Sequence, residues 1–251
     1  MPVKFTVVIP ARFGASRLPG KPLVDLNGKP MIQHVYERAQ QSDADAVYVA
    51  TDDERIRDAV EQFGGSVIMT ESTHRSGTDR IHEVATRLEL DDDRLVVNVQ
   101  GDEPLIPPAA INQVAANLDS NPEAGIASLY EAVTDRDEIE DPHAVKVVVD
   151  VNGFALYFSR STIPYGSSVQ ARNCLRHIGI YAYRVETLKR FVAWPPGELE
   201  VQEKLEQLRA LYNGIRIHMA PACSKVPPGI DTERDLQLVR KLLAEIGPAV
   251  S

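Results

Sequence analysis

The sequence predicts an α/β protein in which a doubly wound, mainly parallel sheet carries an inserted, smaller α+β lobe. Short apolar runs typical of buried strands alternate with helical patterns up to about residue 130, as in parallel sheets with crossover helices. Beyond residue 131 the pattern changes, because Asn152 and Gly153 separate two strand-like segments and form a strong hairpin signal. The length of 251 residues suits one large domain or a domain with a smaller lobe.

The first half is expected to contain five strands with helices between them. Apolar runs predict strands at residues 5–9, 46–50, 66–69, 95–99 and 125–130. Apolar side chains at helical spacing predict helices that begin near residues 31, 54, 77 and 108. The segment Thr51-Asp52-Asp53 can cap the second helix, and Gly64 and Gly65 can stop it. We also expect Pro10 to end the pairing of the first strand, because proline has no N–H group.

The second half mixes hairpins and helices. Strands are expected at residues 145–149, 154–158, 176–183 and 215–220, and helices at 199–212 and 232–246. We divide the chain into residues 1–130, an inserted lobe at 131–220, and residues 221–251, which return to the main sheet.

Composition excludes several classes of protein. The net charge of −9 argues against a general nucleic-acid or membrane-surface binder, but a small anionic substrate needs only local positive charge. No apolar run has the length of a membrane span, and no signal-peptide pattern opens the chain, so we expect a cytoplasmic protein. Cys174 and Cys223 are too few for a disulfide framework or a metal cluster and are expected to be reduced thiols.

The loop after the first strand is the strongest candidate for a binding site. Residues 10–22 carry two glycines and three cations, and glycine lets a ligand approach the backbone while cations bind oxyanions. Open α/β sheets bind ligands at this position, the carboxyl end of a strand. The loop is not a P-loop, because five residues separate Gly14 from Gly20 and Pro22 follows Lys21. The dinucleotide pattern G-x-G-x-x-G is also absent from it.

Two aspartates are candidate metal ligands. Asp102 directly follows a predicted strand, and Asp231 precedes the last predicted helix. If the two meet, they can hold a hard cation such as Mg²⁺ together with substrate phosphates. The spacing alone leaves other readings open: Asp102 as a turn residue, and Asp231 as a charge beside a helix cap formed by Thr232 and Asp235.

Several motifs carry a family resemblance along nearly the whole chain. The segment VVIPARFGASRLPGKPL at residues 7–23 resembles the N-terminal signature of the CMP-Kdo synthetases, the 3-deoxy-manno-octulosonate cytidylyltransferases, and more weakly that of sialic acid cytidylyltransferases. Further matches follow in order: ATDDERI, HRSGTDR, QGDEPLIPP, AVKVV, ALYFSRSTIP, LRHIGIYAYR, LEQLRAL and VPPGIDTERDL.

The resemblance implies a Rossmann-like nucleotidyltransferase that serves lipopolysaccharide biosynthesis. The anomeric hydroxyl of Kdo would attack the α-phosphorus of CTP and yield CMP-Kdo and pyrophosphate, with Mg²⁺ as cofactor and no protein nucleophile or side-chain base. A homodimer and no nucleic-acid or membrane partner are also implied. Two alternatives stay open: a different acceptor, such as 8-amino-Kdo or sialic acid, and a non-catalytic nucleotide-binding protein.

The resemblance also assigns residues to roles. Residues 1–130 would bind nucleotide, residues 131–220 the sugar acid and the dimer partner, and residues 221–251 would bring the second metal ligand. Residues matching the nucleotide contacts are Ala11, Arg12, Ser16, Arg17, Lys21, Arg75, Ser76 and Gly77. Residues matching the sugar-acid contacts are Gln100, Arg160, His177, Tyr181, Glu206 and Gln207. Residues with a direct part in catalysis would be Arg12, Lys21, Asp102 and Asp231, the two aspartates as Mg²⁺ ligands.

Some of these positions also have ordinary structural readings. His177 alternates with apolar residues and fits a half-buried strand histidine, Tyr181 fits a core residue, and Glu206 with Gln207 fits a solvated helix face. Arg75 departs from the family, which often has glutamine there. The loop at residues 165–173 is short beside many relatives and would lie near the sugar-acid pocket.

Overall fold

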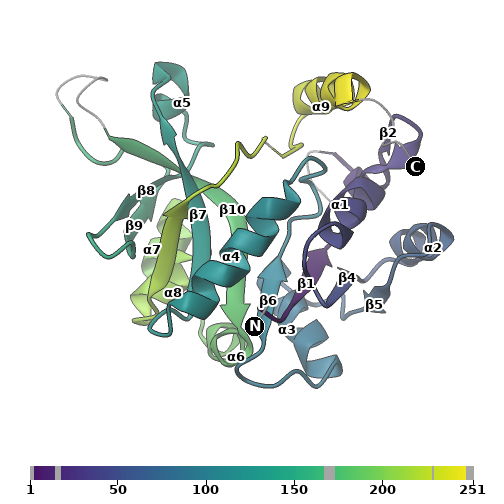
Figure 1. Ribbon diagram of the computed structural model, residues 1–251, viewed down its shortest axis with the longest axis horizontal. Coiled ribbons are helices and arrows are strands. Elements are labelled where there is room, and N and C mark those ends of the chain that lie inside the picture. Colours follow the sequence, from purple (N-terminus) through teal and green to yellow (C-terminus); the bar gives the residue numbers. More distant parts are fainter. Residues whose placement is uncertain (1–2, 15–17, 167–172, 228, 247–251) are drawn as a thin grey trace. The chain divides into compact units, whose positions relative to one another are not determined.

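The computed structural model describes residues 3–14, 18–166, 173–227 and 229–246. The chain divides into two compact units. Figure 1 labels the helices and strands of both. The N-terminal unit comprises Lys4–Leu90, Asn98–Asn112 and Val226–Ser251. The central unit comprises Met1–Val3, Asp91–Val97 and Gln113–Lys225.

The N-terminal unit contains a parallel ladder with crossover helices, as the alternating pattern predicted. Its strands lie in the order β1 (Phe5–Pro10), β4 (Ala46–Thr51) and β5 (Val67–Met69). Its helices are α1 (Met31–Gln40), α2 (Glu54–Gln62), α3 (Gly77–Arg87) and α9 (Glu233–Ile246), and α4 (Pro108–Ser120) begins in this unit. A 3-10 helix η1 (Lys21–Leu23) and a small hairpin of β2 (Asp25–Leu26) and β3 (Lys29–Pro30) connect β1 to α1.

Pro10 does not end the pairing of β1, contrary to the expectation from its missing N–H. Pro10 lies opposite Ala50 in the parallel ladder, and the next amide, that of Ala11, donates to the Ala50 carbonyl at 2.9 Å. Successive residues of a strand point their N–H groups to opposite sides. The N–H that proline lacks is therefore one that would point away from β4, and the ladder is intact.

The late segment of the chain packs into the core of the N-terminal unit. Ile230 just before α9 and Leu236 and Val239 on α9 are buried with Leu26 and Met31 from the early segment. Burying an apolar side chain of this size contributes about 1.5–3 kcal/mol. The cluster therefore anchors Ile230 and α9 against β2 and α1.

The central unit is a mixed sheet. Its strands lie in the order β11 (Ile217–Pro221), β7 (Ile126–Val133), β10 (Cys174–Arg184) and β6 (Leu95–Asn98). β11 is parallel and β10 antiparallel to β7. The predicted hairpin is present as β8 (Lys146–Val149) and β9 (Ala155–Ser159), which turns at Gly153 with φ of 80° and adds to β10 through β8.

The single helix expected at residues 199–212 is wrong. The chain forms two short helices, α7 (Glu198–Glu203) and α8 (Leu208–Tyr212), because Lys204 between them is left-handed with φ of 54°. The Arg160 guanidinium donates hydrogen bonds to the carbonyls of Glu203 and Lys204. In a continuous helix these carbonyls would accept from backbone N–H groups of the next turn. Two helices were also not predicted: α5 (Arg136–Glu140) and α6 (Val185–Ala193).

Cys174 is buried and Cys223 is exposed, and the two are not joined by a disulfide. None of the helices formed by the described residues is long and apolar enough to cross a membrane.

Candidate active site

Three segments far apart in the sequence bring Lys21, Asp102 and Asp231 together in the N-terminal unit. The Lys21 Nζ donates to Asp102 Oδ2 at 2.6 Å and to Asp231 Oδ1 at 3.0 Å. The Lys21 side chain is only 10% exposed, whereas those of Asp102 and Asp231 are 36% and 65% exposed. The sequence predicted all three residues as site residues, and the structure shows that one ammonium group contacts both carboxylates.

Glycines let the backbone bring the two aspartates together. A Cβ atom on Gly101 would lie 2.8 Å from the Pro10 carbonyl, so only glycine permits the approach of this loop to the end of β1. A Cβ on Gly229 would lie 3.2 Å from the Asp102 carbonyl, which accepts a hydrogen bond from the Ile230 amide at 2.9 Å. This backbone contact places Asp231 next to Asp102.

The backbone at Lys21 is equally constrained. Gly20 is left-handed with φ of 70°, and Pro22 fixes the first turn of η1. Burial disfavours the charged form of Lys21, but the charges and hydrogen bonds of Asp102 and Asp231 outweigh this effect and raise the pKa of Lys21. The lysine is therefore a cation at neutral pH, within reach of two carboxylates.

Arg12 holds the turn that leads into α3. Its Nη2 donates to the carbonyls of His74 at 2.8 Å and Ser76 at 2.9 Å, and its Nη1 to that of Arg75 at 3.4 Å. Ser76 is the N-cap of α3, and it exchanges hydrogen bonds with Asp79 in a capping box. Arg12 thus fixes a helix N-terminus, a position where backbone N–H groups favour anions.

A pocket of about 340 Å³ lies among these groups. The predicted site residues that line it are Ala11, Arg12, Lys21, Arg75, Ser76, Gly77, Gln100 and Asp102. Ser16 and Arg17, predicted to contact the triphosphate, lie outside the described residues. The pocket combines three cations with a helix N-terminus, which suits a polyanionic ligand.

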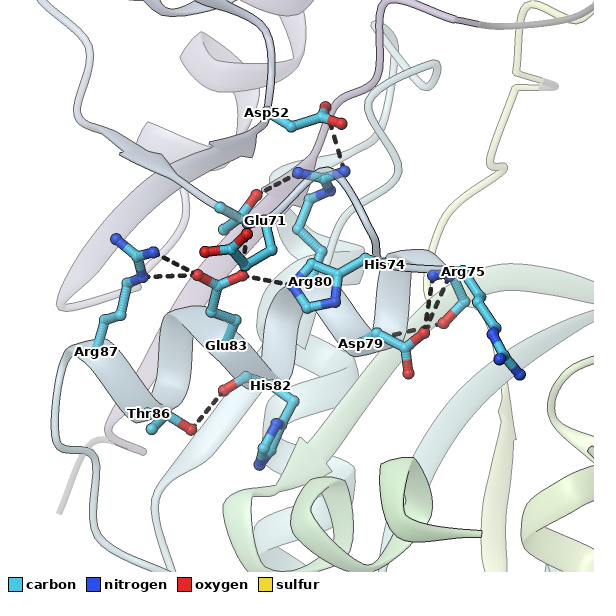
Figure 2. Close-up of polar contacts among 12 residues, drawn as sticks. Asp52, Glu71, His74, Arg75, Asp79, Arg80, His82, Glu83, Thr86 and Arg87 are labelled. Carbon is cyan, nitrogen blue, oxygen red and sulfur yellow. Dashed lines mark hydrogen bonds and ion pairs between the residues drawn. The ribbon is translucent and has the colours of Figure 1, made fainter. Parts of the chain in front are cut away.

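Arg80 has a positioning role that the sequence did not indicate beyond its place in the HRSGTDR motif. It is fully buried on α3, where Nη1 donates to Thr70 and Nη2 lies 3.2 Å from Asp52 Oδ1 as an ion pair (Figure 2). Burial lowers the pKa of Arg80 while Asp52 opposes this effect. The arginine therefore ties α3 to the residues that follow β5 and β4. Apart from the motif, the sequence indicates this role of Arg80 only by placing a charged residue on the helix face that carries the apolar residues.

Glu83 also holds the turn at residues 74–76, whose carbonyls Arg12 binds. Its carboxylate accepts hydrogen bonds from His74, from the Glu71 amide at 2.9 Å and from Arg87 at 2.7 Å (Figure 2). Burial works against the charge of Glu83, but these bonds outweigh it and lower its pKa. The turn at residues 74–76 is thus held through the His74 side chain as well as through its carbonyls.

His177 of the central unit is a neutral residue held by a serine. Its Nε2 lies 3.0 Å from Ser128 Oγ, and its ring packs against Phe158 and Tyr181 at centroid distances of 5.1 and 5.3 Å. Although the residue keeps some solvent exposure, burial of the ring lowers the pKa of His177 to about 3. His177 therefore carries no charge at neutral pH and can only make neutral hydrogen bonds.

Arg160 is committed to the fold of the central unit. Its Nε donates to the Glu203 carbonyl at 2.8 Å, Nη1 to that of Pro142 at 3.0 Å and Nη2 to that of Lys204 at 3.3 Å. The Glu203 carboxylate in turn accepts from Ser159 Oγ at 2.7 Å and from the Arg160 amide at 3.0 Å. Each terminal nitrogen still has a second N–H, so a role toward a ligand stays a prediction.

The other predicted sugar-acid residues differ in burial. Tyr181 is half-buried and stacks near Tyr183 at a centroid distance of 5.8 Å. Gln207 is only 8% exposed, so the reading of Glu206 and Gln207 as a solvated helix face is wrong for Gln207. Gln207 is the N-cap residue of α8, three residues after the left-handed Lys204 that ends α7.

Comparison with known proteins identifies the class of enzyme that this chain resembles. The sequence matches the cytidylyltransferase family over residues 6–217, which is most of the chain. A solved structure of CMP:2-keto-3-deoxy-manno-octonic acid synthetase complexed with CTP is 46% identical, with a TM-score of 0.90 over 97% of this chain and 99% of the other. The Rossmann-like α/β nucleotidyltransferase fold expected from the sequence is therefore confirmed.

Curated relatives narrow the class to one family. The 3-deoxy-manno-octulosonate cytidylyltransferase of Saccharophagus degradans is 57% identical over 96% of this chain and 99% of its own length. The enzyme of the same name from Hahella chejuensis is 56% identical, with 96% and 98% covered. The chain belongs to the 3-deoxy-manno-octulosonate cytidylyltransferase family.

Proposed function

We propose that this chain transfers the cytidylyl group of CTP to the anomeric hydroxyl of Kdo and releases pyrophosphate. The observation that carries the proposal is the contact of Lys21 with both Asp102 and Asp231, beside a pocket that Arg12 and Gln100 also line. Family membership supports CTP and Kdo as the two substrates. The product then serves lipopolysaccharide biosynthesis, as the resemblance implied.

The two aspartates fit a divalent metal ion. Both place a carboxylate oxygen within 3.0 Å of one buried cation, so their geometry already suits a positive charge between them. Among the residues that the structure describes, no cluster of three or more histidine, cysteine or acidic side chains could complete a metal site. We therefore propose Mg²⁺ held by Asp102 and Asp231, since Mg²⁺ usually takes few protein carboxylates plus water and substrate phosphates. When bound, it supplies positive charge at the reacting phosphate.

The chain itself contributes positive charge and position. Lys21 offers an ammonium to the triphosphate and to the departing pyrophosphate, which carries more negative charge as the bond breaks. Arg12 contributes a guanidinium at the pocket and, through its bonds to the turn at residues 74–76, orients the N-terminus of α3. Ser76, Gly77 and Gln100 line the same pocket, where the first two are proposed to contact the nucleotide and Gln100 the acceptor sugar. The acceptor hydroxyl is the nucleophile, so no covalent enzyme intermediate is required.

The central unit is proposed to hold the sugar acid. His177 is neutral and its Nε2 is shared with Ser128, which leaves the other ring nitrogen for a sugar hydroxyl. Arg160 retains N–H groups suited to a carboxylate. Tyr181, Glu206 and Gln207 complete the proposed set.

A homodimer is also proposed. The family resemblance implies it, and the central unit exposes several large apolar side chains that a partner could cover. They include Leu156 at 60%, Val201 at 65% and Tyr212 at 59% exposure. Light scattering coupled to size-exclusion chromatography measures the mass in solution, and a monomeric mass at micromolar concentration would contradict the dimer.

The direct test is pyrophosphate release from CTP and Mg²⁺, with and without Kdo. Release that needs both substrates supports the proposal. Release with sialic acid or 8-amino-Kdo but not with Kdo would change the acceptor and keep the chemistry. Folded protein that binds CTP and releases no pyrophosphate with any acceptor would favour a non-catalytic nucleotide-binding protein.

A further inference from the structure

Asp102 and Asp231 form a pair of like charges that needs a cation. Their carboxylate oxygens both approach one point, and two carboxylates that share a site repel each other unless a positive group compensates them. The compensating group in the structure is the Lys21 ammonium, at 2.6 and 3.0 Å from the two oxygens. The lysine therefore occupies the position that the same oxygens would offer to a metal ion.

Lys21 can leave this position without a change of the backbone. Its main chain is fixed by Gly20 and Pro22 and by the hydrogen bond of its own amide to the Leu18 carbonyl at 3.0 Å. Its ammonium, in contrast, stands at the end of four flexible methylene groups. Lys21 and Asp102 both line the pocket proposed for the triphosphate, so a triphosphate bound there would offer the ammonium an alternative anionic partner.

We propose that the Lys21 ammonium acts as a built-in placeholder for the divalent cation. In the nucleotide-free protein the lysine holds the two carboxylates together and excludes a metal ion, because two cations cannot share the same pair of oxygens at these distances. When nucleotide enters, the lysine moves to its phosphates and leaves the carboxylates to the metal ion. This inference rests on the proposed assignment of Asp102 and Asp231 as metal ligands.

The placeholder couples metal binding to nucleotide binding. A metal ion that arrives alone must displace Lys21 without giving the ammonium another partner, so its affinity is low. A metal ion that arrives with a triphosphate also provides that partner, so its affinity is higher. By linkage, the nucleotide gains from the metal the same factor that the metal gains from the nucleotide.

The test measures binding of Mn²⁺ to the nucleotide-free full chain by electron paramagnetic resonance. Lys21→Met keeps most of the length of the side chain and removes its charge, and we expect it to bind Mn²⁺ at least about tenfold more tightly than the unchanged protein. Lys29→Met is the matched control, because Lys29 pairs with the surface residue Glu37, and it should leave Mn²⁺ affinity unchanged. Lys21→Gln is the second variant, should Lys21→Met fail to fold.

The double variant Lys21→Met with Asp102→Asn separates the assignment of the aspartates as metal ligands from the placeholder role of Lys21. If it loses the gained affinity, the metal binds at the aspartates and the placeholder is supported. If Lys21→Met gains nothing but adding Asp102→Asn still weakens Mn²⁺ binding, the metal assignment stands and the placeholder is wrong. If Asp102→Asn changes nothing in either background, the metal assignment itself fails. Affinity gained in Lys21→Met and kept in the double variant would place Mn²⁺ elsewhere and overturn both.

Discussion

Arg12 in the N-terminal unit and Arg160 in the central unit were both predicted to bind ligand anions. Each donates to three backbone carbonyls. The three carbonyls bound by Arg12 belong to consecutive residues of one turn, and both Arg12 and that turn line the pocket. The carbonyls bound by Arg160 belong to residues 142, 203 and 204. The guanidinium therefore joins residue 142 to the junction between α7 and α8, where the helical path is broken.

The difference shows that a cation in a motif can serve the fold, the ligand or both. Arg12 orders backbone that itself faces the candidate ligand, so its structural bonds and its proposed binding role support each other. Arg160 orders backbone at the junction of α7 and α8, so ligand binding would have to use its remaining N–H groups. Variants can therefore separate the two roles.

The largest effect is expected for Asp102→Asn. The amide keeps the shape of the side chain and removes the charge that Lys21 and the proposed metal ion require, so turnover should fall by at least about 100-fold. Stability should change little, because Asp102 is partly exposed. Pyrophosphate release and thermal unfolding measure the two quantities. Asp58→Asn on α2 is the matched control, and near-normal turnover of folded Asp102→Asn would sink the metal assignment.

Arg80→Ala should lower stability more than any exposed substitution in the N-terminal unit. It opens a cavity on α3 and leaves Asp52 and Thr70 without their cation, with an expected loss of about 3 kcal/mol in the free energy of unfolding. Urea unfolding measures the loss, and Arg87→Ala, on the exposed face of the same helix, serves as control. Unchanged stability would show that Asp52 and Thr70 rearrange to satisfy each other.

Arg12→Ala and Arg160→Ala together break or sharpen the comparison between the two units. Arg12→Ala should raise the KM for CTP by about tenfold, because a charge-assisted contact and the order of the turn at residues 74–76 are both lost, with little change for Kdo. Arg160→Ala should leave the KM for CTP unchanged. Steady-state kinetics with each substrate varied in turn gives these values, and equal effects of Arg12→Ala on both substrates would contradict its nucleotide role.

A pH dependence of stability is expected from His177. Because burial holds the pKa of His177 at about 3 in the folded chain, below its ordinary value of 6.5, the unfolded chain takes up a proton first as pH falls. The contribution of His177 to stability is therefore present above pH 6.5 and is lost toward pH 3, at no more than about 1.4 kcal/mol per pH unit. His177→Gln should flatten this part of the stability profile, measured by urea unfolding at pH 4–7. An identical slope in the variant would assign the dependence to other groups.

The sequence predicted the parallel strands, their helices and the cationic loop, because the spacing of apolar residues and the composition of a loop are local properties of the chain. Asp102 and Asp231 were predictable as candidates, since each stands at the edge of a recognisable element. Their contact through Lys21 was not predictable, because it depends on Gly229 and Ile230 meeting the Asp102 carbonyl across more than a hundred residues. The break at Lys204 was missed for the same reason, because the carbonyls that it frees accept hydrogen bonds from the distant Arg160.

The hydrogen bond from the Ile230 amide to the Asp102 carbonyl has a consequence for how the protein is made. Asp231 is translated more than a hundred residues after Asp102, so a growing chain holds Lys21 and Asp102 long before it holds their partner. A chain cut short before residue 226 would contain the loop at residues 10–22 without the second carboxylate. The order of synthesis thus withholds the complete charge cluster until residue 231 has been translated.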